Sequence, residues 1–157
     1  MSVSIKLEGV GSVHAVFREL ADEIGDKKAT SKILIPAVRE SMKPVLAKAR
    51  ADAPVDTGGL KRSLQVEARR PNRKDKRSKY IANTDTVISL VTTAPGKKLA
   101  KLGIKSDARA IAQEFGTARN PAHPYLRAAL ESQSTSVVNN LAGILARRID
   151  KYKKANL

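Results

Sequence analysis

The chain has 157 residues, and its 30 Lys and Arg against 15 Asp and Glu give a formal net charge of +15. This length suits one domain with a single core and argues against a two-domain enzyme with a cleft between its domains. The absence of Cys excludes disulfide scaffolds, thiol nucleophiles and Cys-ligated zinc. We expect neither a membrane span nor a secretory signal, because the chain lacks an apolar run of about 18 residues and a basic start followed by an apolar stretch.

The beginning of the chain predicts a strand and a helix. Residues 3–7 alternate apolar and polar side chains, which is typical of a strand with one buried face. Apolar residues at helical spacing over 13–24 predict a helix that Ser12 caps and Gly25 ends. A polar turn is expected over 26–30.

A second helix is expected over about 31–51, with Pro36 in its first turn. Pro44 predicts a kink or two helices that meet at Lys43, because an interior proline costs about 3 kcal/mol. The helix should end before Pro54, whose preceding residue favours extended geometry. Its expected apolar stripe consists of Ile35, Val38, Met42, Val45 or Leu46, and Ala49.

The middle of the chain predicts two strands joined by a basic loop. Residues 54–59 are dense in turn formers. Alternation over 64–69 and β-branched residues over 86–92 predict strands that pair with each other. Residues 69–79 contain no apolar side chain and are expected to form a mobile loop.

The last third predicts two more helices. A short one should end at Phe115, with Gly116 as its stop, and a stiff loop should cover 119–124. A long C-terminal helix follows, with the stripe Leu126, Leu130, Val137, Leu141, Ile144 or Leu145, Ile149 and Tyr152. The expected fold is therefore a single α+β domain over 1–157, with a small antiparallel sheet, two N-terminal helices and a long C-terminal helix. It carries basic insertions at about 70–83 and 95–106.

Positive charge is concentrated after residue 60. Residues 1–60 carry 9 basic and 8 acidic side chains, whereas residues 61–157 carry 21 and 7. The basic runs are either solvated loops or contacts with DNA or an acidic partner. Because aromatic residues make up only 3% of the chain, any nucleic-acid contact should be directed at phosphates and sensitive to salt. The candidates for such contact are Arg69, Arg70, Arg73, Lys74, Lys76, Arg77, Lys79, Lys97, Lys98 and Lys101.

The sequence offers little for catalysis. Asp56-Thr57-Gly58 matches the tripeptide of retroviral-type aspartic proteases, but one copy would require a dimer, and the long helices do not fit such an enzyme. We expect instead that Asp56 or Thr57 caps a turn and that Gly58 or Gly59 has a positive φ. The only histidines, His14 and His123, have no carboxylate at ligand spacing. No catalytic residue, metal or cofactor is therefore predicted.

Three motifs in this order resemble the tail-completion proteins of long-tailed bacteriophages, of the minor tail protein Z type. They are Ala-Asp-Ala-Pro-Val-Asp-Thr-Gly-Gly-Leu over 51–60, Glu-Phe-Gly-Thr over 114–117, and Asn-Pro-Ala-His-Pro-Tyr-Leu-Arg-Ala-Ala-Leu-Glu over 120–131. The resemblance covers about residues 5–149. The motif residues that it implies are fold-defining are Pro54, Asp56, Thr57, Gly58, Leu60, Phe115, Gly116, Thr117, Pro121, Pro124 and Leu126.

The resemblance implies a structural, non-enzymatic protein of the head–tail neck of a virion, assembled in the host cytoplasm. It would form a homo-oligomeric ring, expected to be six-fold, around the DNA channel. Its implied partners are tail terminator or tail tube proteins and head connector proteins, together with non-specific contact to packaged DNA and none to a membrane. The alternative is a free basic protein that binds nucleic acid non-specifically.

Overall fold

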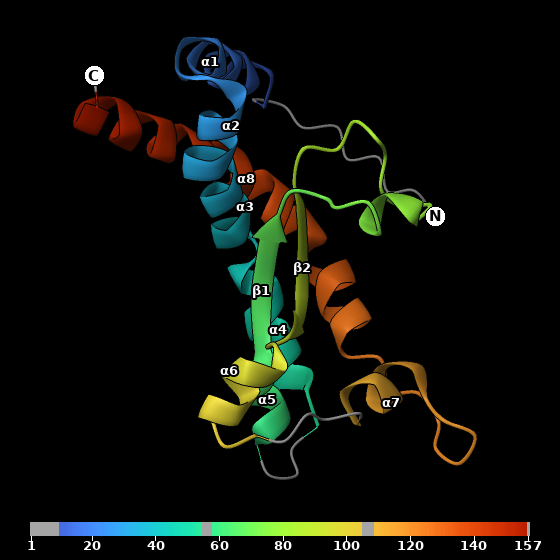
Figure 1. Cartoon of the computed structure of the whole chain (residues 1–157). Helices are drawn as coiled ribbons and strands as arrows, with labels where there is room; N and C mark the ends of the chain where they lie inside the picture. The colour runs from blue at the N-terminus through green and yellow to red at the C-terminus, as the bar shows by residue number, and fades with distance from the viewer. Residues whose placement is uncertain (1–9, 55–57, 105–108, 157) are drawn as a thin grey trace. The chain divides into compact units, whose positions relative to one another are not determined.

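The computed structural model describes residues 10–54, 58–104 and 109–156 (Figure 1). The strand predicted over 3–7 lies outside these residues. The chain divides into two compact units. Unit 1 holds the described residues up to Ser41, residues 68–90 and the residues from Thr135 onward, and unit 2 holds residues 42–67 and 91–134.

Unit 1 begins with a series of helical segments. α1 (Val10–Ile24) ends at Gly25 as predicted, with a φ of 92° at that glycine. The polar turn predicted over 26–30 is wrong, because α2 (Asp26–Ala29) begins directly after Gly25 and continues through a π-helical turn, Thr30–Leu34, into α3 (Ile35–Ser41). Ala29 and Thr30 are both buried, so core packing extends the helix through a segment that looks polar in the sequence.

Pro36 is the second residue of α3, as a first-turn position predicts, but α3 continues directly from the π-helical turn, so the proline lies inside a longer helical run than the sequence indicated. The π-helical turn precedes it directly, and the N–H of Ile35 bonds to the carbonyl of Thr30, five residues back. A proline in an α-helix lacks its N–H and clashes with the carbonyl four residues earlier. A widened turn just before Pro36 is a known way for a helix to accommodate this conflict.

Pro44 separates two helices, as one of the two sequence alternatives predicted. α3 ends at Ser41, and α4 (Lys43–Asp52) begins two residues later with Pro44 in its first turn. The missing N–H of a proline costs little there, because first-turn N–H groups have no partner within the helix. α4 ends before Pro54, as predicted.

The buried stripe of these helices differs from the predicted one. Ile35 and Val38 are only half-buried, although Met42, Val45 and Ala49 are buried as expected. The π-helical turn and the break at Met42 both lengthen the local repeat, so buried positions recur every four residues. They are Ala29, Ile33, Ala37, Ser41, Val45 and Ala49.

The core of unit 1 joins the N-terminal helices to the C-terminal one. Leu20, Ile33 and Ala37 pack with Leu145 and Ile149 of α8 (Leu126–Asn156), the long helix that the sequence predicts. None of the described helices combines the length and the apolar character that crossing a membrane requires.

Among the described residues, two antiparallel strands form a sheet, as predicted. β1 (Leu64–Arg69) follows the short helix α5 (Gly59–Ser63) and pairs with β2 (Ile88–Thr93) (Figure 1). Within unit 1, Arg39 Nη2 of α3 donates to the carbonyl of Ala68 at 3.2 Å, and within unit 2, Arg50 Nη2 of α4 donates to that of Leu64 at 2.8 Å. The fold is therefore α+β, as expected.

Two short helices follow the sheet. α6 (Gly96–Lys101) forms inside the second basic segment, where no helix was predicted. α7 (Arg109–Phe115) ends at Gly116, as predicted.

Candidate functional site

The connection between β1 and β2 carries the densest group of cations. Residues 70–79, which we call the cationic loop, contain a short 3-10 turn, Asp75–Arg77. Arg69, at the end of β1, forms a two-armed ion pair with Asp75, with Nη2 and Oδ1 3.0 Å apart. The pKa of Asp75 is lowered to about 2, chiefly by the hydrogen bond from Arg69 and then by the N–H of Asn72. This carboxylate is ionised in any physiological buffer and fixes the loop to the strand.

Backbone contacts complete the frame of the loop. The side-chain oxygen of Asn72 accepts from the N–H groups of Lys74 and Asp75 at 2.8 and 3.0 Å. The N–H of Asn72 donates in turn to Asp75 Oδ2 at 2.7 Å. Asp85 Oδ2 accepts from the N–H of Ala82 at 2.9 Å in the segment that leads to β2. The segment that was expected to be mobile thus contains hydrogen-bonded local structure.

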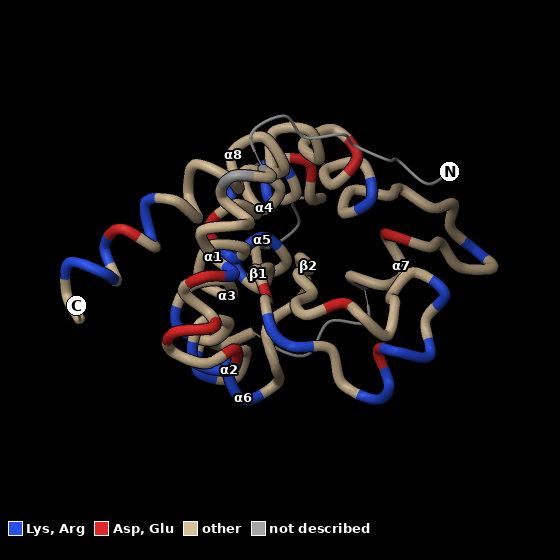
Figure 2. Tube along the Cα trace, turned by 90° about the horizontal axis from the view of Figure 1, so that it is seen from above, with Lys and Arg blue, Asp and Glu red and all other residues tan. Residues whose placement is uncertain are grey.

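The remaining cations of the loop are exposed, and one of them, Lys76, also donates from Nζ to the carbonyl of Asn83 at 3.3 Å. Figure 2 shows Lys and Arg positions recurring along the connection between the strands. Of the ten candidates for DNA or acidic-partner contact, Arg69 alone is only half-exposed, because it pairs with Asp75. The exposed ones in or next to the loop are Arg70, Arg73, Lys74, Lys76, Arg77 and Lys79. Arg70 also reaches the carbonyl of Asp26 at 3.4 Å.

The second group of cations lies on unit 2. Lys97, Lys98 and Lys101 are exposed on α6. Lys98 Nζ donates to Gln65 Oε1 on β1 at 2.8 Å. These lysines stand on a helix that is tied to the sheet rather than on an extended loop.

The second and third motifs meet at the connection between α7 and α8. The carboxylate of Glu114 is 8% exposed and accepts from two first-turn N–H groups of α8, Leu126 at 2.9 Å and Arg127 at 3.0 Å. Gly116 has a φ of 76°, and a Cβ on it would lie 2.8 Å from the nitrogen of Ala122. Glu114 belongs to the second motif, but the sequence indicated no role for it. A residue that caps a different helix produces no local spacing pattern that could reveal it.

The other motif residues have less contact with the core. Thr117 Oγ1 accepts from the N–H of Asn120 at 3.1 Å and helps to order the loop before α8. Pro121 and Pro124 are exposed in that loop, and Leu60 and Pro54 are half-buried. Gly58 has a positive φ of 72° and precedes α5, as one of the two expected glycines. Asp56 and Thr57 lie outside the described residues.

Apolar side chains are exposed on both units. In unit 2, Ile111 is 67% and Phe115 is 68% exposed, one turn apart on α7. Unit 1 has a groove of about 520 Å³ that the apolar side chains of Phe17, Leu34 and Leu141 help to line. The polar residues His14, Arg18, Asp26 and Arg70 also line it. Exposed apolar surface of this kind is typical of contact with other chains.

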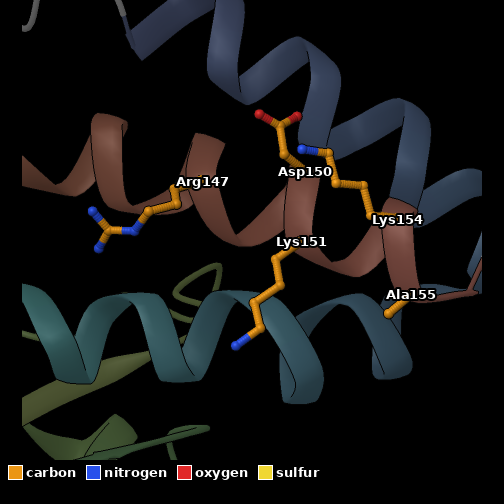
Figure 3. A pocket seen from close by; sticks show the side chains of 5 residues that line it. All are labelled: Arg147, Asp150, Lys151, Lys154 and Ala155. Atoms are coloured by element: carbon orange, nitrogen blue, oxygen red, sulfur yellow. The ribbon is translucent and has the colours of Figure 1, made fainter.

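No converging set of reactive groups is found in the part of the chain that the structure describes. An open hollow of about 650 Å³ beside the end of α8 is lined by Arg147, Asp150, Lys151, Lys154 and Ala155. Figure 3 shows the side chains of Arg147 and Lys151 pointing away from those of Asp150 and Lys154. No group of three His, Cys, Asp or Glu among the described side chains could hold a metal ion.

The described surface presents exposed cations and exposed apolar side chains, which are typical of contact with other macromolecules. Comparison with known families identifies the class as structural, since the family described as "Bacteriophage HK97-gp10, putative tail-component" matches residues 16–116. The chain belongs to this HK97-gp10-like family of phage tail components, which implies a part of the virion and no enzymatic role. No curated protein and no solved structure matches the chain.

Proposed function

We propose that this chain completes the phage tail and joins it to the head connector as one subunit of a ring around the DNA channel. The observation that carries the proposal is the family of phage tail components, together with the three motifs that resemble tail-completion proteins. The proposed partners are further copies of the chain in a six-fold ring, tail terminator or tube proteins on one side, and connector proteins on the other. The proposed location is the head–tail neck of the virion.

The exposed apolar side chains support a role in assembly. Ile111 and Phe115 project from α7, where their exposure contributes nothing to the stability of a monomer. Burying such side chains against a neighbour stabilises an assembly by about 1.5–3 kcal/mol each. A repeated contact between two different patches closes into a ring when the rotation between subunits allows it.

Electron microscopy of particles made without this chain tests the proposal. We expect filled heads and finished tubes that fail to join stably, with joining restored when the chain is supplied in trans. Normal joined particles in its absence would refute the neck role.

A paired substitution tests the apolar contact separately. Ile111→Ser with Phe115→Ser should reduce self-association of the purified chain in analytical ultracentrifugation. At dilutions where the chain is monomeric it should leave the melting temperature unchanged, because both side chains are exposed in the monomer. Leu102→Ser is the matched control, since Leu102 is 41% exposed but lies outside α7. Equal association of the paired variant and the control would contradict a contact through α7.

The net charge of +15 favours one alternative, a free protein that binds nucleic acid non-specifically. This alternative predicts that deletion of the chain leaves head–tail joining intact. It also predicts that the protein is found on DNA or RNA rather than in purified particles.

A further inference from the structure

We propose that the cationic loop is a preorganised site for the phosphate backbone of duplex DNA, in which the Arg69–Asp75 ion pair holds the exposed cations in a fixed arrangement. The inference deepens the proposed function, because a ring around the DNA channel brings packaged DNA past such a loop. The cations assigned to phosphate contact are Arg73, Lys74, Lys76 and Arg77, all of them exposed. Asp75 is a positioning residue that touches no phosphate itself.

The internal pairing removes the one acidic residue of the loop from its outer surface. Asp75 lies between Lys74 and Lys76 in the sequence, so a free carboxylate there would weaken attraction of an anion. Its two oxygens instead accept from Arg69 and from the N–H of Asn72. The side chain of Asp75 is 17% exposed. The outward charge of the loop is therefore uniformly positive.

The composition of the loop favours DNA over an acidic protein. Protein–protein contacts are centred on buried apolar or aromatic anchors and are depleted in Lys. Within residues 70–79 the only apolar side chain is Pro71, and Tyr80, which follows the loop beside Lys79 and is 81% exposed, is the one aromatic side chain next to it. Lys and Arg that contact phosphates without reading bases need no such anchor.

Binding of the purified full chain to a short fluorescent duplex of mixed sequence, over a series of salt concentrations, tests the site. Replacing Arg73, Lys74, Lys76 and Arg77 together with Gln should flatten the slope of log affinity against log salt by about 3.6, at about 0.9 for each lost phosphate contact. The matched control replaces four exposed lysines elsewhere, Lys32, Lys43, Lys151 and Lys154, with Gln. Both variants carry a net charge of +11, that is +15 less 4.

The control should keep most of the wild-type slope. If both variants lose the same amount, binding depends on net charge alone and the proposed site is refuted. Displacement of the duplex by polyglutamate at an equal concentration of charge would also refute it, because the loop would then fit an acidic protein equally well.

Asp75→Ala distinguishes the arrangement of the cations from the net charge, because the two explanations predict opposite changes in the affinity for DNA. The substitution raises the net charge to +16, so simple attraction predicts tighter binding. A preorganised loop predicts weaker binding and a slope flattened by about 0.9–1.8, which corresponds to one or two lost contacts. Asp75→Asn should recover part of the loss, because an amide oxygen can still accept from Arg69. Unchanged or tighter binding by Asp75→Ala would overturn the positioning role.

Failure of this inference is distinguishable from failure of the proposed function. If the chain does not bind duplex DNA but particles without it fail to join, only the phosphate-binding role of the cationic loop is refuted. If it binds through the loop but its deletion leaves joining intact, only the neck role is refuted.

Discussion

Substitution of Glu114 by Ala tests the helix cap by which the second motif of the sequence holds the third. The Glu114 carboxylate accepts from the N–H groups of Leu126 and Arg127, which begin α8 and have no acceptor within that helix. Alanine leaves both donors without their acceptor in a site where Glu114 is 8% exposed. It also removes a negative charge from the positive end of the helix dipole.

The cost follows from the two hydrogen bonds. Bonds to a charged group contribute about 1.5–3 kcal/mol each, but water can replace part of them once the side chain is gone. A net loss of about 3 kcal/mol in the free energy of unfolding is expected. For a chain of this size it lowers Tm by roughly 9 °C, at about 3 °C per kcal/mol.

Thermal and urea unfolding, followed by circular dichroism, measure this loss. Glu131→Ala is the control, because it removes the same charge from an exposed position on α8 and should change stability by less than about 0.5 kcal/mol. Glu114→Gln should fall between alanine and wild type, since it keeps one oxygen acceptor. If Glu114→Ala differs from wild type no more than the control does, Glu114 does not cap α8.

Three further measurements test the fold and the loop. Gly116→Ala should lower the free energy of unfolding in urea by about 1–3 kcal/mol, because it forces a side chain onto a φ of 76°. Gly143→Ala, which has open space around it inside α8, should raise the free energy of unfolding by about 0.5–1 kcal/mol. Equal effects of the two substitutions would contradict the turn geometry at Gly116. Ile33→Ala should lower the free energy of unfolding by about 2–5 kcal/mol, because Ile33 is fully buried. Ile35→Ala should lower it clearly less. The reverse order would mean that the buried stripe is the one predicted from the sequence. The carboxyl carbon of Asp75 should titrate by NMR near pH 2. Since its pKa is lowered on folding, its contribution to loop stability is present above about pH 4 and lost as the pH falls towards 2; a midpoint near 3.8 would mean that the ion pair does not form in solution.

Local patterns predicted most of the elements. The glycine at 25, the proline at 44 and the glycine at 116 each end or interrupt a helix where the sequence indicates, because their backbone restrictions act without help from distant residues. Alternation predicted β1, and β-branched residues predicted β2 to within two positions. The apolar stripe from Leu126 to Tyr152 predicted α8, which extends to Asn156, although Leu130 of that stripe is 48% exposed.

Tertiary packing decided what these local patterns could not. Residues 26–30 are polar in composition and become helical because Ala29 and Thr30 enter a core whose other members are distant in the sequence. The π-helical turn before Pro36 then shifts the buried face, so that Ile33 rather than Ile35 faces the core. Local sequence fixes where the backbone can bend. It does not fix which side of a helix meets a partner, since that depends on chain segments brought together only by folding.

The same distinction applies to the candidate site. The sequence by itself determined that the connection between the strands is rich in cations and that it carries one acidic residue. Only the folded chain showed that Asp75 turns inward to Arg69 and that Glu114 caps a helix twelve residues away. The charge of a side chain is set by its chemistry alone, whereas its direction is set by the partners that the fold places within hydrogen-bonding distance.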